Sequence, residues 1–407
     1  MTLYVALVLH IYQPPTQTPA ILKQIIKESY LPLFKVIAKN PETRITFNIN
    51  GSLIELLNLY EENKLLDAIK SLVIKEQIDL IGSSCYHAIL PLIPQEEIIR
   101  QIKLNEEIYN KVLGENVFRP KGFWLPEMAY EYGVIEPLIA ENFEWTVISS
   151  VATPEVELPD DFIPFVKSNF KIYFRNDLLS NLISFKDPTV EEFYQELKGT
   201  KKPENDDYYV ILAMDGETYG HHIKGLIEKF FEPLIAKINQ DSEVKLVKIA
   251  ELPQYFSQER KVNPVPSTWS TTAEDLQQGV PFPLWSDPNN RIHNLQLTVM
   301  NHTLFLVGKA QRYFNNNHKQ PKEIVTRYEN ARSWLDMGLH SCQLWWASGR
   351  PWYSSEMILK GLNQLILASS EALKVVLKNC TDNNEIETVK RIFNEIFEAQ
   401  KEIYLSV

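Results

Sequence analysis

Short apolar runs alternate with amphipathic stretches from residue 3 to about residue 260. Residues 3–11 (LYVALVLHI) are apolar and rich in β-branched side chains, which indicates a buried strand that ends before Pro14 and Pro15. Similar runs predict further strands at 44–49, 78–82, 121–124, 143–149, 170–175 and 208–214. Helical spacing of apolar residues predicts helices at 18–39, 53–59, 65–76 and 94–113. Strands that alternate with helices predict an α/β fold with a mostly parallel sheet, either a barrel or an open sheet.

The strand pattern fades from about residue 287 onward, and long helical patterns replace it. These patterns predict helices at 292–314, 322–339, 355–379 and 384–405. Residues 259–288 are rich in Pro, Ser, Thr and Trp and are interpreted as an irregular loop, long enough to suggest a functional role. We therefore expect an α/β domain at 1–265, a loop with a functional role at 266–290, and a helical domain at 291–407 packed on the α/β domain.

Polar side chains recur just after the ends of the predicted strands. They are His10, Asn50, His87, Glu127 and Asp215. In parallel α/β folds the carboxyl ends of the strands meet at one face, and that face holds the functional site. The sequence therefore predicts that these side chains lie close together.

Two of these residues are carboxylic acids. Glu127 follows Phe123, Trp124 and Pro126, an apolar and stiff surround that can hold a carboxyl group in one orientation. Asp215 ends an apolar strand and precedes Gly216. Each has an ordinary alternative: Glu127 as a surface acid or helix cap, and Asp215 as the cap of a helix at 216–220.

Considered as a pair, the two acids suit the cleavage of a glycosidic bond. That reaction needs one carboxylate that attacks the anomeric carbon or activates water, and one carboxylic acid that protonates the leaving oxygen. Different surroundings would separate the pKa values of the two groups and assign the two roles.

The histidines and tryptophans admit more than one role. Four residues could be imagined as zinc ligands: His10, Asp215, His221 and His222. The chain lacks HExxH or a similar spacing, so a zinc site is disfavoured. A hydrogen bond from His10 to a sugar hydroxyl, or a purely structural role for this histidine, is favoured instead. Trp269 and Trp285 lie in the predicted loop, where a core role is harder to justify. The pair Trp345 and Trp346 could stack on a sugar or pack in a core.

The composition narrows the classes of partner. The chain has 407 residues, 44% of them hydrophobic, and a formal net charge of −11 without a basic stripe, which disfavours nucleic acid and anionic membranes. Three dispersed cysteines do not form a disulfide framework or a zinc cluster, and no glycine-rich phosphate loop is present. The apolar start of the chain lacks the basic region and cleavage site of a signal peptide, so we expect a cytoplasmic protein.

Five segments in order resemble the sequence regions of glycoside hydrolase family 57. They read HIYQPP, GSSCYHAILPLIP, GFWLPEMAY, MDGETYGHH and SCQLWWAS, and they span residues 10 to about 348. The resemblance implies an incomplete (β/α)7 barrel followed by an α-helical domain, and a retaining mechanism on α-linked glucans or malto-oligosaccharides without a metal or other cofactor.

The same resemblance implies roles for individual residues. Glu127 aligns with the nucleophile of the family and Asp215 with its general acid/base. His10 would line the sugar subsite beside the nucleophile. The remaining substrate-binding candidates are Gln13, His87, Trp124, His222, Trp269, Trp285, Gln343 and Trp346.

The sequence departs from the family at Gln343, where many members have an acid before the aromatic pair. An amide can hydrogen-bond a sugar hydroxyl but supplies no negative charge. We therefore expect an α-amylase or 4-α-glucanotransferase type of enzyme, with two alternatives: an α-glucan-binding protein of weak or no activity on the same fold, and a metal-dependent sugar deacetylase on a related barrel. The oligomeric state does not follow from the sequence.

Overall fold

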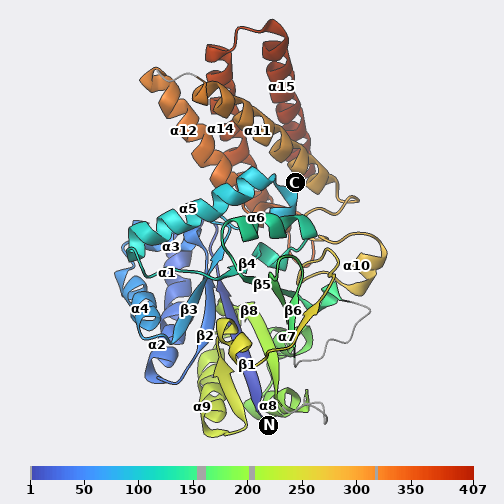
Figure 1. Ribbon diagram of the computed structural model, residues 1–407. Helices are drawn as coiled ribbons and strands as arrows, with labels where there is room; N and C mark the ends of the chain where they lie inside the picture. The colour runs from blue at the N-terminus through green and yellow to red at the C-terminus, as the bar shows by residue number, and fades with distance from the viewer. Residues whose placement is uncertain (1, 154–161, 201–206, 317–319) are drawn as a thin grey trace. The chain divides into compact units, whose positions relative to one another are not determined.

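The computed structural model describes residues 2–153, 162–200, 207–316 and 320–407, and it divides into two compact units (Figure 1). Unit 1 is Met1–Ala273 and unit 2 is Glu274–Val407. The division falls inside the loop expected at 266–290, and the three-part boundaries expected from the sequence remain a prediction.

Unit 1 is built around a sheet of ten strands among the described residues. The strands are β1 (Leu3–Ile11), β2 (Ile45–Ile49), β3 (Ile78–Ser83), β4 (Gly122–Trp124), β5 (Trp145–Ser149), β6 (Ile163–Phe165), β7 (Lys171–Arg175), β8 (Tyr208–Asp215), β9 (Val244–Val247) and β10 (Glu259–Lys261).

Seven of the described strands run parallel in the order β8-β1-β2-β3-β4-β5-β7. The two ends of this row meet, because the Asn176 amide just after β7 donates to the Ile211 carbonyl of β8 over 2.8 Å. β9 adds to β1 in parallel, while β6 lies antiparallel to β7 and parallel to β10. The predicted α/β class with an incomplete (β/α)7 barrel and a helical C-terminal part is confirmed.

The helices of unit 1 lie around the strands (Figure 1). They are α1 (Pro19–Ile25), α2 (Leu31–Lys39), α3 (Gly51–Leu59), α4 (Asn63–Ile74), α5 (Gln95–Leu113), α6 (Ile135–Ala140), α7 (Asp177–Lys186), α8 (Val190–Gly199) and α9 (Glu232–Gln240). The short α10 (Ala273–Gln277) spans the division between the two units in the sequence. A π-helical turn, η1 (Ile26–Tyr30), joins α1 to α2, so the predicted helix at 18–39 is continuous but contains one wider turn.

Alternate residues of each strand face two different cores, as the period of two in a strand requires. On β1, Leu3, Val5, Leu7, Leu9 and Ile11 pack against the helices, and Tyr4, Ala6 and Val8 pack inside the barrel. β8 alternates in the same way, with Tyr209, Ile211 and Ala213 inside. The next inward positions, His10 and Asp215, are polar, so the apolar core inside the barrel ends just before these two side chains.

Unit 2 is helical. Its long helices are α11 (Arg291–Asn315), α12 (Lys322–Gly338), α14 (Ser355–Asn379) and α15 (Asn383–Ser406), with the short α13 (Cys342–Trp345) between α12 and α14. α14 packs against α11, α12 and α15 (Figure 1). Among the described helices, none is both long enough and apolar enough to cross a membrane.

The interpretation of residues 259–288 as an irregular loop is wrong in part. The segment contains β10 at its start and α10 in its second half. β10 escapes the pattern because Glu259, Arg260 and Lys261 are all exposed, so the strand has no buried face to give an alternating signal.

Candidate active site

The carboxyl ends of β1, β7 and β8 bring three polar residues together. His10 of β1 and Asp215 of β8 are partners in the parallel register. Arg175 ends β7 on the same face as Tyr173, which packs inside the barrel, and its Nε donates to the Ala213 carbonyl of β8 over 2.7 Å. A cation, an imidazole and a carboxyl group therefore line one edge of the barrel.

Glu127 lies on a strained turn just after β4. The turn is a 3-10 helix, η3 (Pro126–Met128), in which Glu127 has a φ of 59° and Met128 a φ of 50°. The left-handed region is costly for residues other than glycine, and such residues cluster at functional sites where surrounding contacts hold them in place. His87, the neighbour of Glu127, also has a positive φ of 60°.

Trp269 holds the Glu127 side chain, which is 17% exposed. The indole Nε1 of Trp269 donates to Glu127 Oε2 over 2.9 Å, and the Trp269 amide donates to the Glu127 carbonyl over 3.2 Å. A reciprocal pair of backbone bonds between Tyr130 and Ser267 fixes the same two segments to each other. The loop around Trp269 and the turn with Glu127 are thus one assembly.

Four aromatic rings stand nearly parallel beside this assembly. The His10 ring lies 4.9 Å from both Trp124 and His87, and the His87 ring lies 4.0 Å from Tyr12. His87 Nδ1 is 3.7 Å from Glu127 Oε1. The stack links the ends of β1 and β4 with the turn after β3, and it includes three of the predicted substrate-binding residues.

His10 is a neutral donor-acceptor group at moderate pH. Burial lowers the pKa of His10 to about 4, although a hydrogen bond to Asn48 opposes the shift. Its Nδ1 lies 2.7 Å from Asn48 Oδ1, so the Nδ1 proton is used there and Nε2 is left as the acceptor. A neutral imidazole suits a hydrogen bond with a sugar hydroxyl.

Asp215 keeps some exposure and does not act as a helix cap. It precedes a 3-10 turn, η6 (Gly216–Thr218), but its side chain makes no capping hydrogen bond. Burial raises the pKa of Asp215 to about 6, and the positive charge of Arg175 opposes the shift. Gly216 is required next to it, because a β-carbon there would lie 2.4 Å from the Ile11 side chain.

Glu217 is a third carboxyl group, and it is absent from the site residues predicted from the sequence. It is 5% exposed, and its Oε1 accepts hydrogen bonds from the Tyr12 amide and the Gln13 amide group, both over 3.2 Å, and from the Tyr30 hydroxyl. Burial, and next the charge of Asp215, raise the pKa of Glu217 to about 8. The sequence could have identified Glu217 as a site residue from its position two residues after Asp215.

Two carboxyl groups with different surroundings can do acid–base and nucleophilic work together. Asp215, with its raised pKa, can hold a proton near neutral pH and deliver it to a leaving oxygen. Glu127 is aimed by an indole N–H and stays partly open to a ligand. Neutral His10 can share a hydrogen bond with a sugar hydroxyl, and the buried rings of Trp124 and His87 hold it rigidly in place.

The other predicted residues of unit 1 are placed as follows. Gln13 contacts Tyr30 and Glu217 and is buried, so it supports the turn with Asp215. His222 is exposed, with its ring 5.7 Å from that of His221.

Three predicted substrate-binding residues belong to unit 2. Trp285 is fully buried, Trp346 is half-buried, and Gln343 is 2% exposed with its amide donating to the Gly338 carbonyl. Gln343 also packs tightly on Gly361, where a β-carbon would lie 2.5 Å from it. The side chain of Gln343 thus has a role inside the helical unit, and its role toward substrate remains a prediction.

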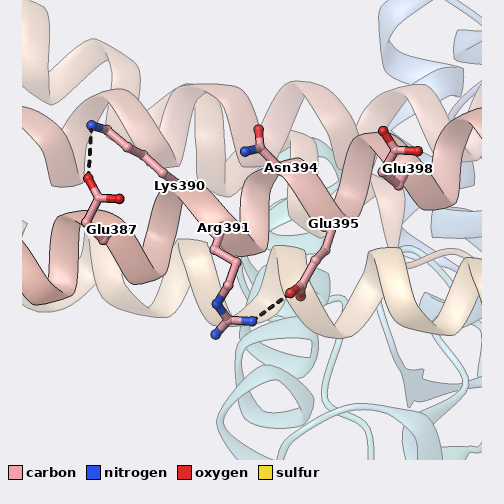
Figure 2. Close-up of a pocket in the computed structure, with 6 residues that line it drawn as sticks. All are labelled: Glu387, Lys390, Arg391, Asn394, Glu395 and Glu398. Carbon is pink, nitrogen blue, oxygen red and sulfur yellow. Dashed lines mark hydrogen bonds and ion pairs between the residues drawn. The ribbon is translucent and has the colours of Figure 1, made fainter.

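A surface hollow or a metal cluster would be an alternative to this site. A hollow on α15 is lined by charged residues that pair with one another, such as Lys390 with Glu387 and Arg391 with Glu395 (Figure 2). This is a solvated helix face without aromatic rings, and its carboxylates are ion-paired or exposed. Within the part of the chain that the structure describes, no group of three His, Cys, Asp or Glu residues could hold a metal ion.

Comparison with known proteins gives concordant matches. The model of the family described as Glycosyl hydrolase family 57 matches residues 8–265. An α-amylase of Pyrococcus abyssi is 24% identical over 296 residues, which are 67% of this chain and 43% of that protein. A 4-α-glucanotransferase of Thermococcus litoralis is 24% identical over 249 residues, which are 57% of this chain and 36% of that protein. The chain thus spans about two fifths of the length of these curated relatives.

The fold also matches a crystal structure over nearly its whole length. The branching enzyme of Pyrococcus horikoshii superposes with a TM-score of 0.74 at 15% identity, covering 97% of this chain and 94% of that one. At this identity the likeness concerns the fold alone.

Proposed function

The chain belongs to glycosyl hydrolase family 57, and on this premise we propose that it is a retaining enzyme acting on α-linked glucans, of the α-amylase or 4-α-glucanotransferase type. Glu127 is the nucleophile and Asp215 the general acid/base. The observation that carries the proposal is the pair of carboxyl groups at the carboxyl ends of β4 and β8, one aimed by Trp269 and one with a pKa raised to about 6.

The reaction runs in two steps. Glu127 attacks the anomeric carbon while protonated Asp215 gives its proton to the leaving oxygen, so a glycosyl–Glu127 ester forms and the glycosidic bond breaks. Asp215, now ionised, takes a proton from water or from a sugar hydroxyl as that oxygen attacks the anomeric carbon, so the bond from this carbon to Glu127 breaks and the Glu127 carboxylate is released. Water gives hydrolysis, and a sugar hydroxyl gives transfer.

Support for these roles comes from the surroundings of each group. The indole N–H of Trp269 fixes the orientation in which the Glu127 carboxylate attacks the anomeric carbon. Neutral His10 packs with the buried rings of His87 and Trp124, and this stack forms a rigid support beside Glu127. The relatives include an α-amylase and a 4-α-glucanotransferase, which favours α-glucans as the substrate class.

The product profile from maltoheptaose tests the proposal. We expect shorter sugars if water is the acceptor, and both shorter and longer sugars if a second glucan is. Glu127→Gln should abolish both outcomes, since an amide is a poor nucleophile here. Binding of maltoheptaose without turnover by the unmodified protein would favour the glucan-binding alternative, and full activity of Glu127→Gln would refute the assignment.

A further inference from the structure

Arg175 is a buried cation at the end of β7 that none of the motifs singled out. It is 4% exposed, and all three of its guanidinium nitrogens donate hydrogen bonds. Nε donates to the Ala213 carbonyl over 2.7 Å, Nη1 to Asp177 Oδ1 over 2.6 Å, and Nη2 to Asn181 Oδ1 over 2.8 Å. These bonds fix the plane of the group, because the guanidinium fork is rigid.

Arg175 is hydrogen-bonded to the strand that carries Asp215, and its charge affects the pKa of Asp215. Ala213, to which it donates, lies two residues before Asp215 on β8. The positive charge of Arg175 lowers the pKa of Asp215 and so opposes the effect of burial.

Arg175 also lies against Trp269, the residue that holds the Glu127 side chain. The guanidinium carbon is 5.8 Å from the centre of the Trp269 ring, within the range of a cation–π contact. The indole of Trp269 in turn donates to Glu127 Oε2. A single cation thus contacts both the strand that carries Asp215 and the indole that orients Glu127.

We propose that Arg175 is a positioning residue for both carboxyl groups, with its charge acting on Asp215 and its guanidinium supporting the indole that orients Glu127. The inference rests on the proposed function and deepens it. It requires that Arg175 be the charge to which Asp215 responds.

Three titratable groups near Asp215 are neutral where Asp215 titrates, and a fourth, Asp177, is ion-paired with Arg175. Glu217, on the adjoining turn η6, has a pKa raised to about 8, so it is still protonated at the pH where Asp215 loses its proton. His10, the register partner on β1, has a pKa lowered to about 4. Tyr30 of η1 has a pKa raised well above its usual value, by burial first. Asp177 of α7 is paired with Arg175 itself over 2.6 Å.

The test compares pH profiles of kcat/KM on maltoheptaose for the unmodified protein and three variants. Arg175→Met removes the charge and keeps much of the side-chain length. We expect its alkaline limb to move upward by about 1 pH unit, since loss of a nearby cation raises the pKa of a carboxyl group. We also expect kcat to fall by about 100-fold, since the indole that orients Glu127 loses its support.

Arg175→Lys separates the two effects and also guards against a folding defect in Arg175→Met. Lysine keeps the charge but not the planar fork, so the alkaline limb should stay in place while kcat still falls. Arg391→Met, on the exposed face of α15, is the matched control and should leave both quantities unchanged.

Each remaining outcome is decisive. An active unmodified protein with an unchanged alkaline limb in folded Arg175→Met would overturn the inference and leave the proposed function standing, even if the variant melts at a lower temperature. Normal kcat in Arg175→Lys would overturn the positioning of Glu127. Absence of turnover by the unmodified protein would remove the proposed function, and the inference with it.

Discussion

At the scale of single residues, the account depends on two carboxyl groups whose environments differ. Glu127 is held by an indole N–H on a turn with left-handed backbone, and Asp215 carries a pKa raised to about 6 by burial. The sequence predicted both positions, because each follows an apolar strand. It did not single out Arg175, although this residue continues the inward row of Tyr173 as Asp215 continues that of Ala213. Extending the inward-facing set by every second residue to the end of each strand would have included Arg175.

The pKa of Asp215 predicts the shape of the pH profile. As the general acid, Asp215 must be protonated, so kcat/KM on maltoheptaose should fall as the pH rises through about 6. Asp215→Asn should lose this limb and about 100-fold or more in rate, with a smaller loss on an α-glucosyl fluoride, whose leaving group needs little protonation. Asp67→Asn on exposed α4 is the control, and an alkaline limb that persists in Asp215→Asn would contradict the assignment.

At the scale of elements, the π-helical turn η1 and the turn η6 hold each other. Ser29 donates to the Gly216 carbonyl over 3.1 Å, Tyr30 donates to Glu217, and Glu28 accepts from His221 over 2.7 Å. Three consecutive residues of η1 therefore support the segment that carries Asp215. The apolar spacing at 18–39 predicts a helix but not the wider turn, because a single extra residue per turn hardly changes that spacing.

Glu217 gives this pair of elements a testable dependence of stability on pH. Its pKa is about 8 in the folded protein and about 4.3 in an unfolded chain, so between these values the folded state binds more protons. The free energy of unfolding therefore decreases as the pH rises from about 4 to about 8. Glu217→Gln cannot ionise, so its melting temperature should decline less over this window.

Thermal unfolding at several pH values between 5 and 8 measures this effect. Glu228→Gln, an exposed glutamate of the π-helical turn η7 (Ile227–Phe231), is the matched control and should keep the slope of the unmodified protein. Equal slopes for Glu217→Gln and the unmodified protein would show that Glu217 is not a protonated group at neutral pH.

At the scale of the whole molecule, the sequence predicted the class of fold because seven apolar strands and four long helices each leave a regular pattern. It missed β6, β9 and β10, which have only three or four residues and too little alternation to stand out. It also predicted site residues on both units, and the contacts of Gln343 with Gly338 and Gly361 lie within unit 2. Which strand ends meet depends on the closure between β7 and β8, a long-range contact that local patterns do not contain.

The glycosyl-enzyme is the central claim, and trapping it is the most direct measurement. The protein is incubated with a fluorinated α-glucosyl fluoride that forms the covalent ester quickly and releases it slowly, then digested, and the peptides are analysed by mass spectrometry. The account predicts one added glycosyl group on the peptide that contains Glu127 and none in Glu127→Gln. A label on Asp215 or Glu217 instead, or turnover of maltoheptaose by Glu127→Gln, would contradict it.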